Sequence, residues 1–185
     1  MGLELAKEAY IRGADLTLLV ANVSVEIPSV FNVIKVQSTQ EMHDQIEKLV
    51  SDYDIFISTA AVSDFAVDDT VKSKISSESS MNLTFQPTVK IISQIKKINP
   101  DIFLVGFKAE FNITEEQIIN CSKKQIAVAG TDLVIANDIG HDSCNFGSDF
   151  NEVLIIDEDV MKVPLFSKKE VAKVIFDVIS NKLDK

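Results

Sequence analysis

The order of apolar and polar residues along the chain predicts alternating helices and strands. Helices are predicted where apolar residues recur every three or four positions between capping signals, over residues 3–12, 39–52, 87–98, 114–129 and from 167 onward. Strands are predicted at short apolar runs, over residues 15–22, 32–37, 54–60, 101–110 and 131–138. Residues 151–157 and 161–166 predict an antiparallel hairpin, because only a short acidic segment separates them.

Local signals mark the ends of these elements. Ser38, Thr114 and Ser167 each stand three residues before a Glu or Gln, which is the pattern of a capping box at a helix start. Gly130 is expected to end the helix before it. Pro87 is expected in the first turn of its helix, where a missing N–H breaks no hydrogen bond.

This alternation predicts an α/β fold: one domain over residues 1–185, with a doubly wound, mostly parallel sheet flanked by helices. Ligands of such sheets bind beyond the carboxyl ends of strands, here residues 58–64, 106–110 and 137–138. Nucleotide-binding sheets of this kind usually begin with a strand and a glycine-rich turn. This sequence instead begins in its first predicted helix, so either the fold differs there or the first unit is absent.

Composition narrows the ligand classes. The formal net charge of −10 argues against nucleic acid as a partner, because no basic field attracts a polyanion. Arg12 is the only arginine, so a phosphate ligand must be held by lysines, backbone N–H groups or a metal. Two cysteines without metal or disulfide spacing fit a reducing cytoplasm, and the apolar run at residues 16–21 is too short to span a membrane.

The segment STAAVSD after the third predicted strand is the first candidate site. Its hydroxyl and backbone N–H groups can donate to an anion, and Asp64 can accept from a sugar hydroxyl or help to hold Mg²⁺. An ordinary turn explains the same residues equally well. Lys72 and Lys74 follow in a polar flap, where an ammonium can reach phosphate, although solvated lysines are the commoner case.

Two further strand ends carry candidate chemistry. Phe107 follows Gly106 and can stack on a base, whereas packing in the core is the favoured alternative. Asn137 can read a base edge or begin a turn. His43 and His141 have no partner at ligand or triad spacing and receive no role, and the absence of a G-x-G-x-x-G motif argues against a nicotinamide-dependent oxidoreductase.

Six motifs occur in a recognisable order: AAVSDF, KSKI, QPTVKII, VGFKAE, DLVIANDI and FGSDFNEV. Together they resemble phosphopantothenoylcysteine synthetase, the coenzyme A pathway ligase that is often fused behind a flavin-dependent decarboxylase. The resemblance implies a Rossmann-like fold, a homodimer, and CTP-dependent coupling of 4′-phosphopantothenate to L-cysteine with Mg²⁺. It implies no FMN in this chain, and a non-catalytic nucleotide-binding or dimerisation module of the same fold is the alternative.

The resemblance also assigns roles to residues. Lys74 matches the flap lysine linked to catalysis, and Asp64 matches a nucleotide or cation-site aspartate, here the candidate for Mg²⁺ held through the triphosphate. Lys124, or alternatively Lys123, substitutes for a lysine that the family carries near Gln125. The other nucleotide-binding residues implied by the matching motifs are Ser58, Thr59, Ala60, Phe65, Pro87, Thr88, Val89, Lys90, Phe107 and Asn137.

The sequence also departs from the family at Ala129 and at the N-terminus. Ala129 stands where many members have a lysine. The nucleotide implied by the resemblance is therefore either CTP or another nucleoside triphosphate. The family's first strand and glycine-rich segment come before the first helix, and only Met1 and Gly2 of that segment are present here. The chain is therefore expected to be a fragment, or to start at an internal Met, and to bind nucleotide poorly and fail to catalyse.

Overall fold

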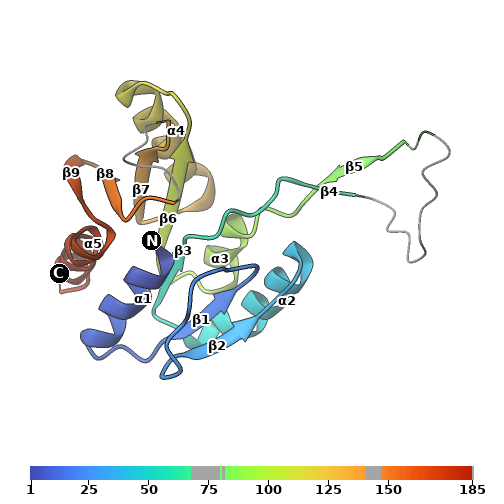
Figure 1. Cartoon of the computed structure of the whole chain (residues 1–185), viewed down its shortest axis with the longest axis horizontal. Coiled ribbons are helices and arrows are strands. Elements are labelled where there is room, and N and C mark those ends of the chain that lie inside the picture. Colours follow the sequence, from blue (N-terminus) through green and yellow to red (C-terminus); the bar gives the residue numbers. More distant parts are fainter. Residues whose placement is uncertain (68–79, 81, 141–146, 185) are drawn as a thin grey trace.

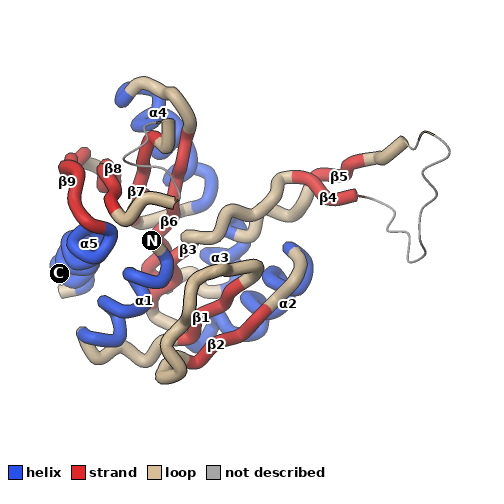
Figure 2. Tube along the Cα trace, viewed as in Figure 1, coloured by secondary structure: helices blue, strands red, loops and turns tan. Residues whose placement is uncertain are grey.

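The computed structural model describes residues 1–67, 80, 82–140 and 147–184. Its α-helices are α1 (Gly2–Ile11), α2 (Thr39–Leu49), α3 (Ile92–Ile98), α4 (Glu115–Ala129) and α5 (Lys168–Leu183), with a short 3₁₀ helix η1 (Val50–Asp52) after α2. Its strands are β1 (Thr17–Val20), β2 (Asn32–Lys35), β3 (Ile55–Ser58), β4 (Phe65–Val67), β5 (Phe85–Pro87), β6 (Phe103–Glu110), β7 (Leu133–Asp138), β8 (Phe150–Ile156) and β9 (Val160–Ser167). The predicted alternation is confirmed, and Figures 1 and 2 show its arrangement.

The largest sheet has the order β3-β6-β7-β8-β9. Strands β3, β6 and β7 are parallel, whereas β8 and β9 form the predicted antiparallel hairpin at the other edge. This confirms the α/β class with a mixed sheet. The expected single sheet is nevertheless divided, because β1 and β2 pair in parallel with each other and, among the described residues, with no strand of the larger sheet.

Helices cover both faces of the larger sheet. On one face α1 and α5 pack with a core that includes Val105, Leu133 and Ile135. On the other face α2 and α3 pack around Leu104, and α4 packs around Val134. Alternate residues of each strand therefore enter opposite cores, as parallel strands between helical layers require.

The capping signals are confirmed in the structure. The side chains of Ser38, Thr114 and Ser167 each accept a backbone hydrogen bond at the start of α2, α4 and α5. Gly130 ends α4 with φ of 69°, a left-handed conformation that glycine adopts without steric strain.

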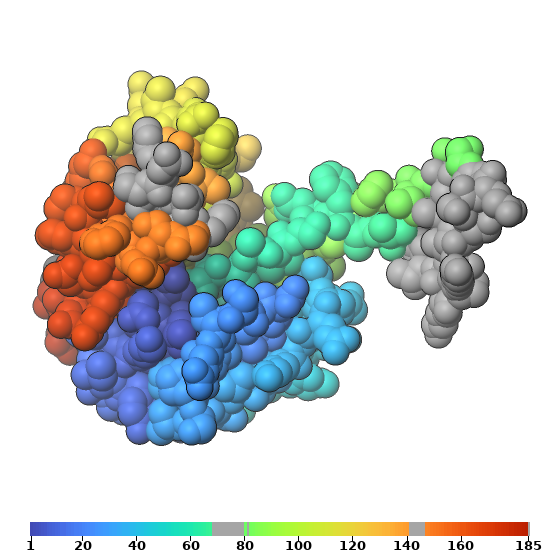
Figure 3. All heavy atoms as spheres, in the orientation of Figure 1, coloured from blue at the N-terminus to red at the C-terminus, as the bar shows by residue number. Residues whose placement is uncertain are grey.

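The expectation for Pro87 is wrong. Pro87 ends β5 and pairs with Phe65 in an antiparallel ribbon, and α3 begins only at Ile92. Proline lacks an N–H but is tolerated at the end of an edge strand. The ribbon β4–β5 projects from the body of the molecule, as Figures 1 and 3 show.

Candidate functional site

The carboxyl end of β3 lies beside the N-terminus of α1. A Cβ at Gly2 would come within 2.8 Å of the Thr59 hydroxyl oxygen, so the start of α1 is in close contact with the residue that follows β3. No side chain caps α1. The N-terminus of a helix carries free N–H groups and a partial positive charge, so this end of the sheet suits an anion.

Ser58 is in register with Gly106, which places the end of β3 against the middle of β6. A Cβ at Gly106 would lie only 2.0 Å from Nε2 of Gln125 and 3.1 Å from Cδ1 of Ile92. A side chain at position 106 would therefore require the Gln125 amide and the end of the Ile92 side chain to move. Gly106 leaves room for these two side chains against the strand, which is a structural reason for the glycine in the motif VGFKAE.

The ribbon brings two of the predicted segments together. The backbone N–H of Thr88 donates to the carbonyl oxygen of Asp64 at 2.9 Å, and the Thr88 hydroxyl donates to the carbonyl oxygen of Ser63 at 2.5 Å. Phe65 pairs with Pro87 directly above this contact. Pro87–Lys90 therefore does not form a helix start, as the sequence predicts, but the root of a ribbon.

Phe107 and Asn137 are held by contacts within the fold. Phe107 is half-buried and packs against the core beneath α1 and α5, in line with the core alternative. Asn137 Nδ2 donates to Oδ1 of the buried Asn151 at 3.4 Å. The Asp138 carboxylate accepts from the backbone N–H groups of Asn112 and Gly140, so it organises the loops that follow β6 and β7.

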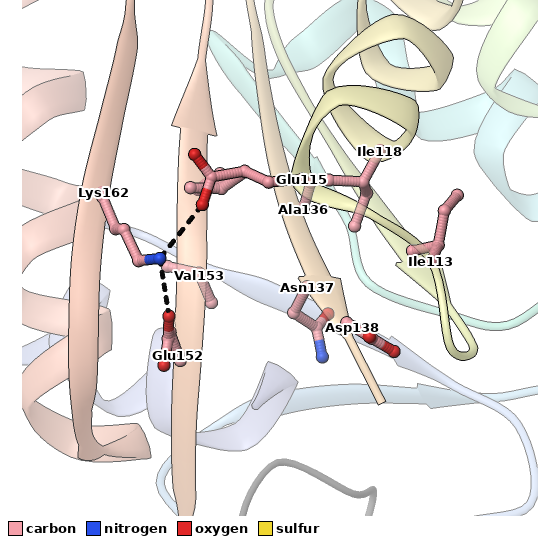
Figure 4. Close-up of a pocket in the computed structure, with 10 residues that line it drawn as sticks. Ile113, Glu115, Ile118, Ala136, Asn137, Asp138, Glu152, Val153 and Lys162 are labelled. Atoms are coloured by element: carbon pink, nitrogen blue, oxygen red, sulfur yellow. Dashed lines mark hydrogen bonds and ion pairs between the residues drawn. The ribbon is translucent and has the colours of Figure 1, made fainter. Parts of the chain in front are cut away.

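A pocket of about 220 Å³ lies between α4, β7, β8 and β9 (Figure 4). Of the predicted strand ends in the described part of the chain, only the pair Asn137 and Asp138 lines it. At its rim Lys162 contacts Glu115 at 3.0 Å and Glu152 at 3.2 Å, and hydrogen bonds to these two carboxylates raise the pKa of Lys162. The pocket is thus separate from the end of β3, where most predicted residues gather.

The predicted lysines are not held at the end of β3 by any contact among the described residues. Lys124 is exposed on α4, and Lys90 is exposed between β5 and α3. Lys72, Lys74 and His141 lie outside the described residues. The candidate site therefore consists of the end of β3, the start of α1 and the root of the ribbon. Among the described lysines, Lys90 is the nearest in sequence to Thr88 at the root of the ribbon.

Two arrangements were missed by the sequence reasoning. On α2, His43 Nδ1 lies 3.6 Å from Asp44 Oδ1 and 3.8 Å from Glu47 Oε2, which corrects the view that His43 lacks a neighbour at ligand spacing. The spacing of four between His43 and Glu47 is the signal that could have found it. The contact of Gln125 with Gly106 joins segments distant in sequence, and no local pattern predicts it.

Comparisons with known proteins place the chain in a family. The model of the DNA/pantothenate metabolism flavoprotein C-terminal domain matches residues 1–183, and the chain belongs to this family. A coenzyme A biosynthesis bifunctional protein CoaBC from Thermococcus kodakarensis is 42% identical over 187 residues, which cover 99% of this chain. The chain spans 45% of the length of that relative, so it corresponds to less than half of it.

Solved structures share the fold. The C-terminal domain of a CoaBC protein superposes with a TM-score of 0.80 at 23% identity, over 98% of this chain and 81% of that one. A Cab2 mutant in complex with phosphopantothenate-cysteine superposes with a TM-score of 0.64 at 11% identity, over 97% of this chain and 76% of that one. The CoaBC relatives are named as coenzyme A biosynthesis proteins.

Proposed function

We propose that this chain is a phosphopantothenate–cysteine ligase domain of coenzyme A biosynthesis. The observation that carries the proposal is that the segment after the carboxyl end of β3 makes two contacts: Thr59 lies against the start of α1, and the Asp64 carbonyl accepts from Thr88 at the root of the ribbon. Nucleotides bind at this end of such sheets, because helix N-termini there face the phosphates. The family and the CoaBC relative support the pathway.

In the proposed reaction, the carboxylate of 4′-phosphopantothenate attacks the α-phosphate of CTP, and pyrophosphate leaves. The amine of L-cysteine then attacks the acyl carbonyl, and CMP leaves with the electrons of the acyl–phosphate bond. The products are 4′-phosphopantothenoylcysteine, CMP and pyrophosphate. The amine loses a proton in this second step, so a base or solvent must accept it.

Residues at the end of β3 have defined tasks in this proposal. The N-terminus of α1 and the Thr59 hydroxyl donate to phosphate oxygens, and Lys74 offsets the charge that develops on the α-phosphate. Asp64 is exposed and belongs to no three-residue ligand cluster among the described residues, which fits Mg²⁺ held mainly by phosphates and water. When bound, that ion would lower the charge of the triphosphate.

The ribbon suits a homodimer, which we include in the proposal. Phe65 and Phe85 are 57% and 58% exposed, and Leu83 beside them is 49% exposed. A two-stranded ribbon is marginally stable in water without packing partners, so a second copy would stabilise it.

We place the protein in the cytoplasm, together with or fused to a flavin-dependent decarboxylase. Among the described residues, none of the helices combines the length and apolar character needed to cross a bilayer.

The test is pyrophosphate release with 4′-phosphopantothenate, Mg²⁺ and each nucleoside triphosphate in turn. It is run on this chain and on the same chain extended upstream of Met1. Release that depends on 4′-phosphopantothenate and is fastest with CTP supports the proposal. If the extended chain binds nucleotide but releases no pyrophosphate with any of them, the chain is a non-catalytic module instead.

Lys74→Ala in the active form is expected to lower turnover about 100-fold, because it removes one charged group from the transition state. Lys48→Ala is the matched control, since Lys48 is an exposed lysine on α2. Circular dichroism of both variants shows whether they fold alike. Unchanged turnover in a folded Lys74→Ala variant would remove Lys74 from the mechanism.

A further inference from the structure

Strand β6 extends further towards the carboxyl end of the sheet than its neighbour β3. The pairing of β3 with β6 ends where Ser58 is opposite Gly106, whereas the pairing of β6 with β7 continues until Glu110 is opposite Asp138. Within the described part of the chain, residues 107–110 of β6 therefore have a paired strand on the β7 side only. On the other side they extend past the end of β3, where the candidate site lies.

Two charged side chains, those of Lys108 and Glu110, lie on this extension of β6. Alternate residues of a strand point to the same face of the sheet, so these two share the face of Gly106. That face is covered by helices, because a Cβ at Gly106 would meet Ile92 of α3 and Gln125 of α4. The two charged residues therefore lie on the same side of the sheet as the start of α3, which follows the root of the ribbon in the chain.

The two side chains form an ion pair that a ligand can reach. The Lys108 ammonium lies 2.8 Å from Oε1 of Glu110, and the two side chains keep 34% and 32% of their surface exposed. Within the described part of the chain, neither has another side-chain partner. An ammonium has three N–H donors and a carboxylate has two acceptor oxygens, so this contact leaves both kinds of group unused. The pair presents a donor and an acceptor side by side.

The charges of the pair decide which part of a nucleotide it suits. A phosphate that approached the Lys108 ammonium would also meet the Glu110 carboxylate beside it, and like charges repel. The N-terminus of α1 beside Thr59 is a better place for phosphates, because it has free N–H groups and a partial positive charge. The donor–acceptor pair suits the polar edge of a base instead.

The spacing of the strands allows one nucleotide to reach both places. Thr59 follows the pair of Ser58 with Gly106, so it is level with residue 107 of β6. A rise of about 3.3 Å per residue and a strand spacing of about 4.8 Å then place Thr59 and Glu110 about 11 Å apart. The base and the phosphates of an extended nucleotide are separated by a distance of this size.

The pair matches a base that carries an amino group next to an accepting ring nitrogen. Cytosine has this arrangement, since its N4 amine donates and the neighbouring N3 accepts. Uracil has a carbonyl oxygen at position 4, which the Glu110 carboxylate would repel, and a proton on N3. Adenine resembles cytosine in this respect and guanine resembles uracil, so the pair favours cytosine and adenine.

We propose that Lys108 and Glu110 read the base of the bound nucleotide. Glu110 accepts from the exocyclic amine, and Lys108 donates to the adjacent ring nitrogen. This inference rests on the proposed nucleotide site, and it names the residues that select CTP over UTP for the ligase reaction. Asn137, which the sequence offers for reading a base edge, donates its amide to Asn151 instead.

The test compares CTP with UTP, which have the same sugar and phosphates. Calorimetric titrations in the presence of Mg²⁺ use the chain extended upstream of Met1, as in the pyrophosphate assay. The wild-type protein is expected to bind CTP at least about 10-fold more tightly than UTP. Glu110→Gln should reduce this ratio at least about 5-fold, because the new amide can turn and donate to the carbonyl oxygen of uracil.

Two further variants separate base reading from a general effect of charge. Lys108→Met should weaken CTP binding at least about 5-fold and UTP binding by less, because protonated N3 of uracil accepts no hydrogen bond. Glu116→Gln removes the same charge from an exposed position on α4, so as the matched control it should leave the ratio unchanged. Circular dichroism shows whether the variants fold alike.

The outcomes distinguish this inference from the ligase proposal. A wild-type ratio near one, or a ratio that Glu110→Gln leaves unchanged while pyrophosphate is still released, would overturn the base-reading pair and leave the ligase standing. A ratio that responds to Glu110→Gln in a protein that releases no pyrophosphate would support the pair and reject the ligase. If neither nucleotide binds, both are rejected.

Discussion

Strands β7 and β3 have similar sequences but very different environments. The segment Leu133–Ala136 of β7 has an exposure of 0% at every residue, whereas no residue of the segment Ile55–Ser58 of β3 is fully buried. Both strands run parallel to β6, and both lie between layers of helices. The difference is that β7 is paired on both sides, by β6 and β8, while β3 is paired only by β6. Burial in this fold therefore depends on edge pairing as well as on the helical layers.

The comparison predicts unequal responses to the same substitution. Ile135→Ala in β7 should lower the free energy of unfolding by about 3–4 kcal/mol, because it leaves a cavity in a closed core. Ile57→Ala in β3 should lower it by only about 1–2 kcal/mol, because part of that side chain is already in water. Urea denaturation with unchanged m-values measures both. Equal losses would show that β3 is as enclosed as β7.

Arg12 links α1 to α5 and gives the next largest effect. Its guanidinium donates to the carboxylates of the buried Glu8 at 2.9 Å and of Asp177 at 2.6 Å, and it lies over the ring of Phe176. The hydrogen bond to Asp177 raises the pKa of Arg12, so the group stays charged.

Arg12→Met should therefore lower the free energy of unfolding by about 2 kcal/mol, since it leaves the Glu8 carboxylate buried without its cation. Lys7→Met, which removes a part-exposed ion pair with Glu4 within α1, is the control and should change it by less than about 0.5 kcal/mol. Thermal and urea denaturation measure the two losses. Equal small losses would mean that Arg12 does not hold α1 against α5.

The sequence predicted most of the fold because its signals are local. Capping residues and apolar periodicity depend on neighbours in the chain, and the structure confirms Ser38, Thr114, Ser167 and Gly130 in their roles. Pro87 was misplaced because proline suits both a helix start and an edge strand, and only the pairing with Phe65 decides.

The candidate site was predicted less completely than the fold. The approach of Gly2 to Thr59 and the contact of Gln125 with Gly106 join distant segments, which no motif specifies. The roles of Lys74, Asp64 and Asn137 in nucleotide binding remain predictions. They depend on a ligand and on residues 68–79, which lie outside the described part of the chain.

Substitutions of the helix caps test whether α2, near the N-terminus, and α5, at the C-terminus, unfold in the same global transition. Ser167→Ala at α5 and Ser38→Ala at α2 each remove a side-chain acceptor from a backbone N–H. Each should lower the free energy of unfolding by about 1 kcal/mol. Urea denaturation measures both losses, with Ser→Thr at each position as the control that keeps the hydroxyl. A loss at α5 without one at α2 would show that α2 unfolds before the global transition.

The smallest effect expected is a pH dependence in the turn between β8 and β9. Burial alone would raise the pKa of Asp157, but hydrogen bonds from the Lys182 ammonium and the Asp159 backbone N–H outweigh it and lower that pKa. A carboxylate with a lowered pKa in the folded state stabilises the fold above its ordinary pKa near 4, and this contribution is lost as the pH falls through the folded value.

Asp157→Asn should therefore reduce the melting temperature slightly at pH 7 and by less at about pH 3, because the contribution is lost as the pH falls towards the lowered pKa of Asp157. Glu158→Gln, at an exposed position in the same turn, is the matched control. Scanning calorimetry at both pH values measures the difference. The turn joins β8 to the edge strand β9, at the opposite edge of the sheet from β3, so the effect should be the same in this chain and in the chain extended upstream of Met1. A change in its size on extending the chain would mean that the two regions unfold as one cooperative unit whose limits reach the far edge of the sheet.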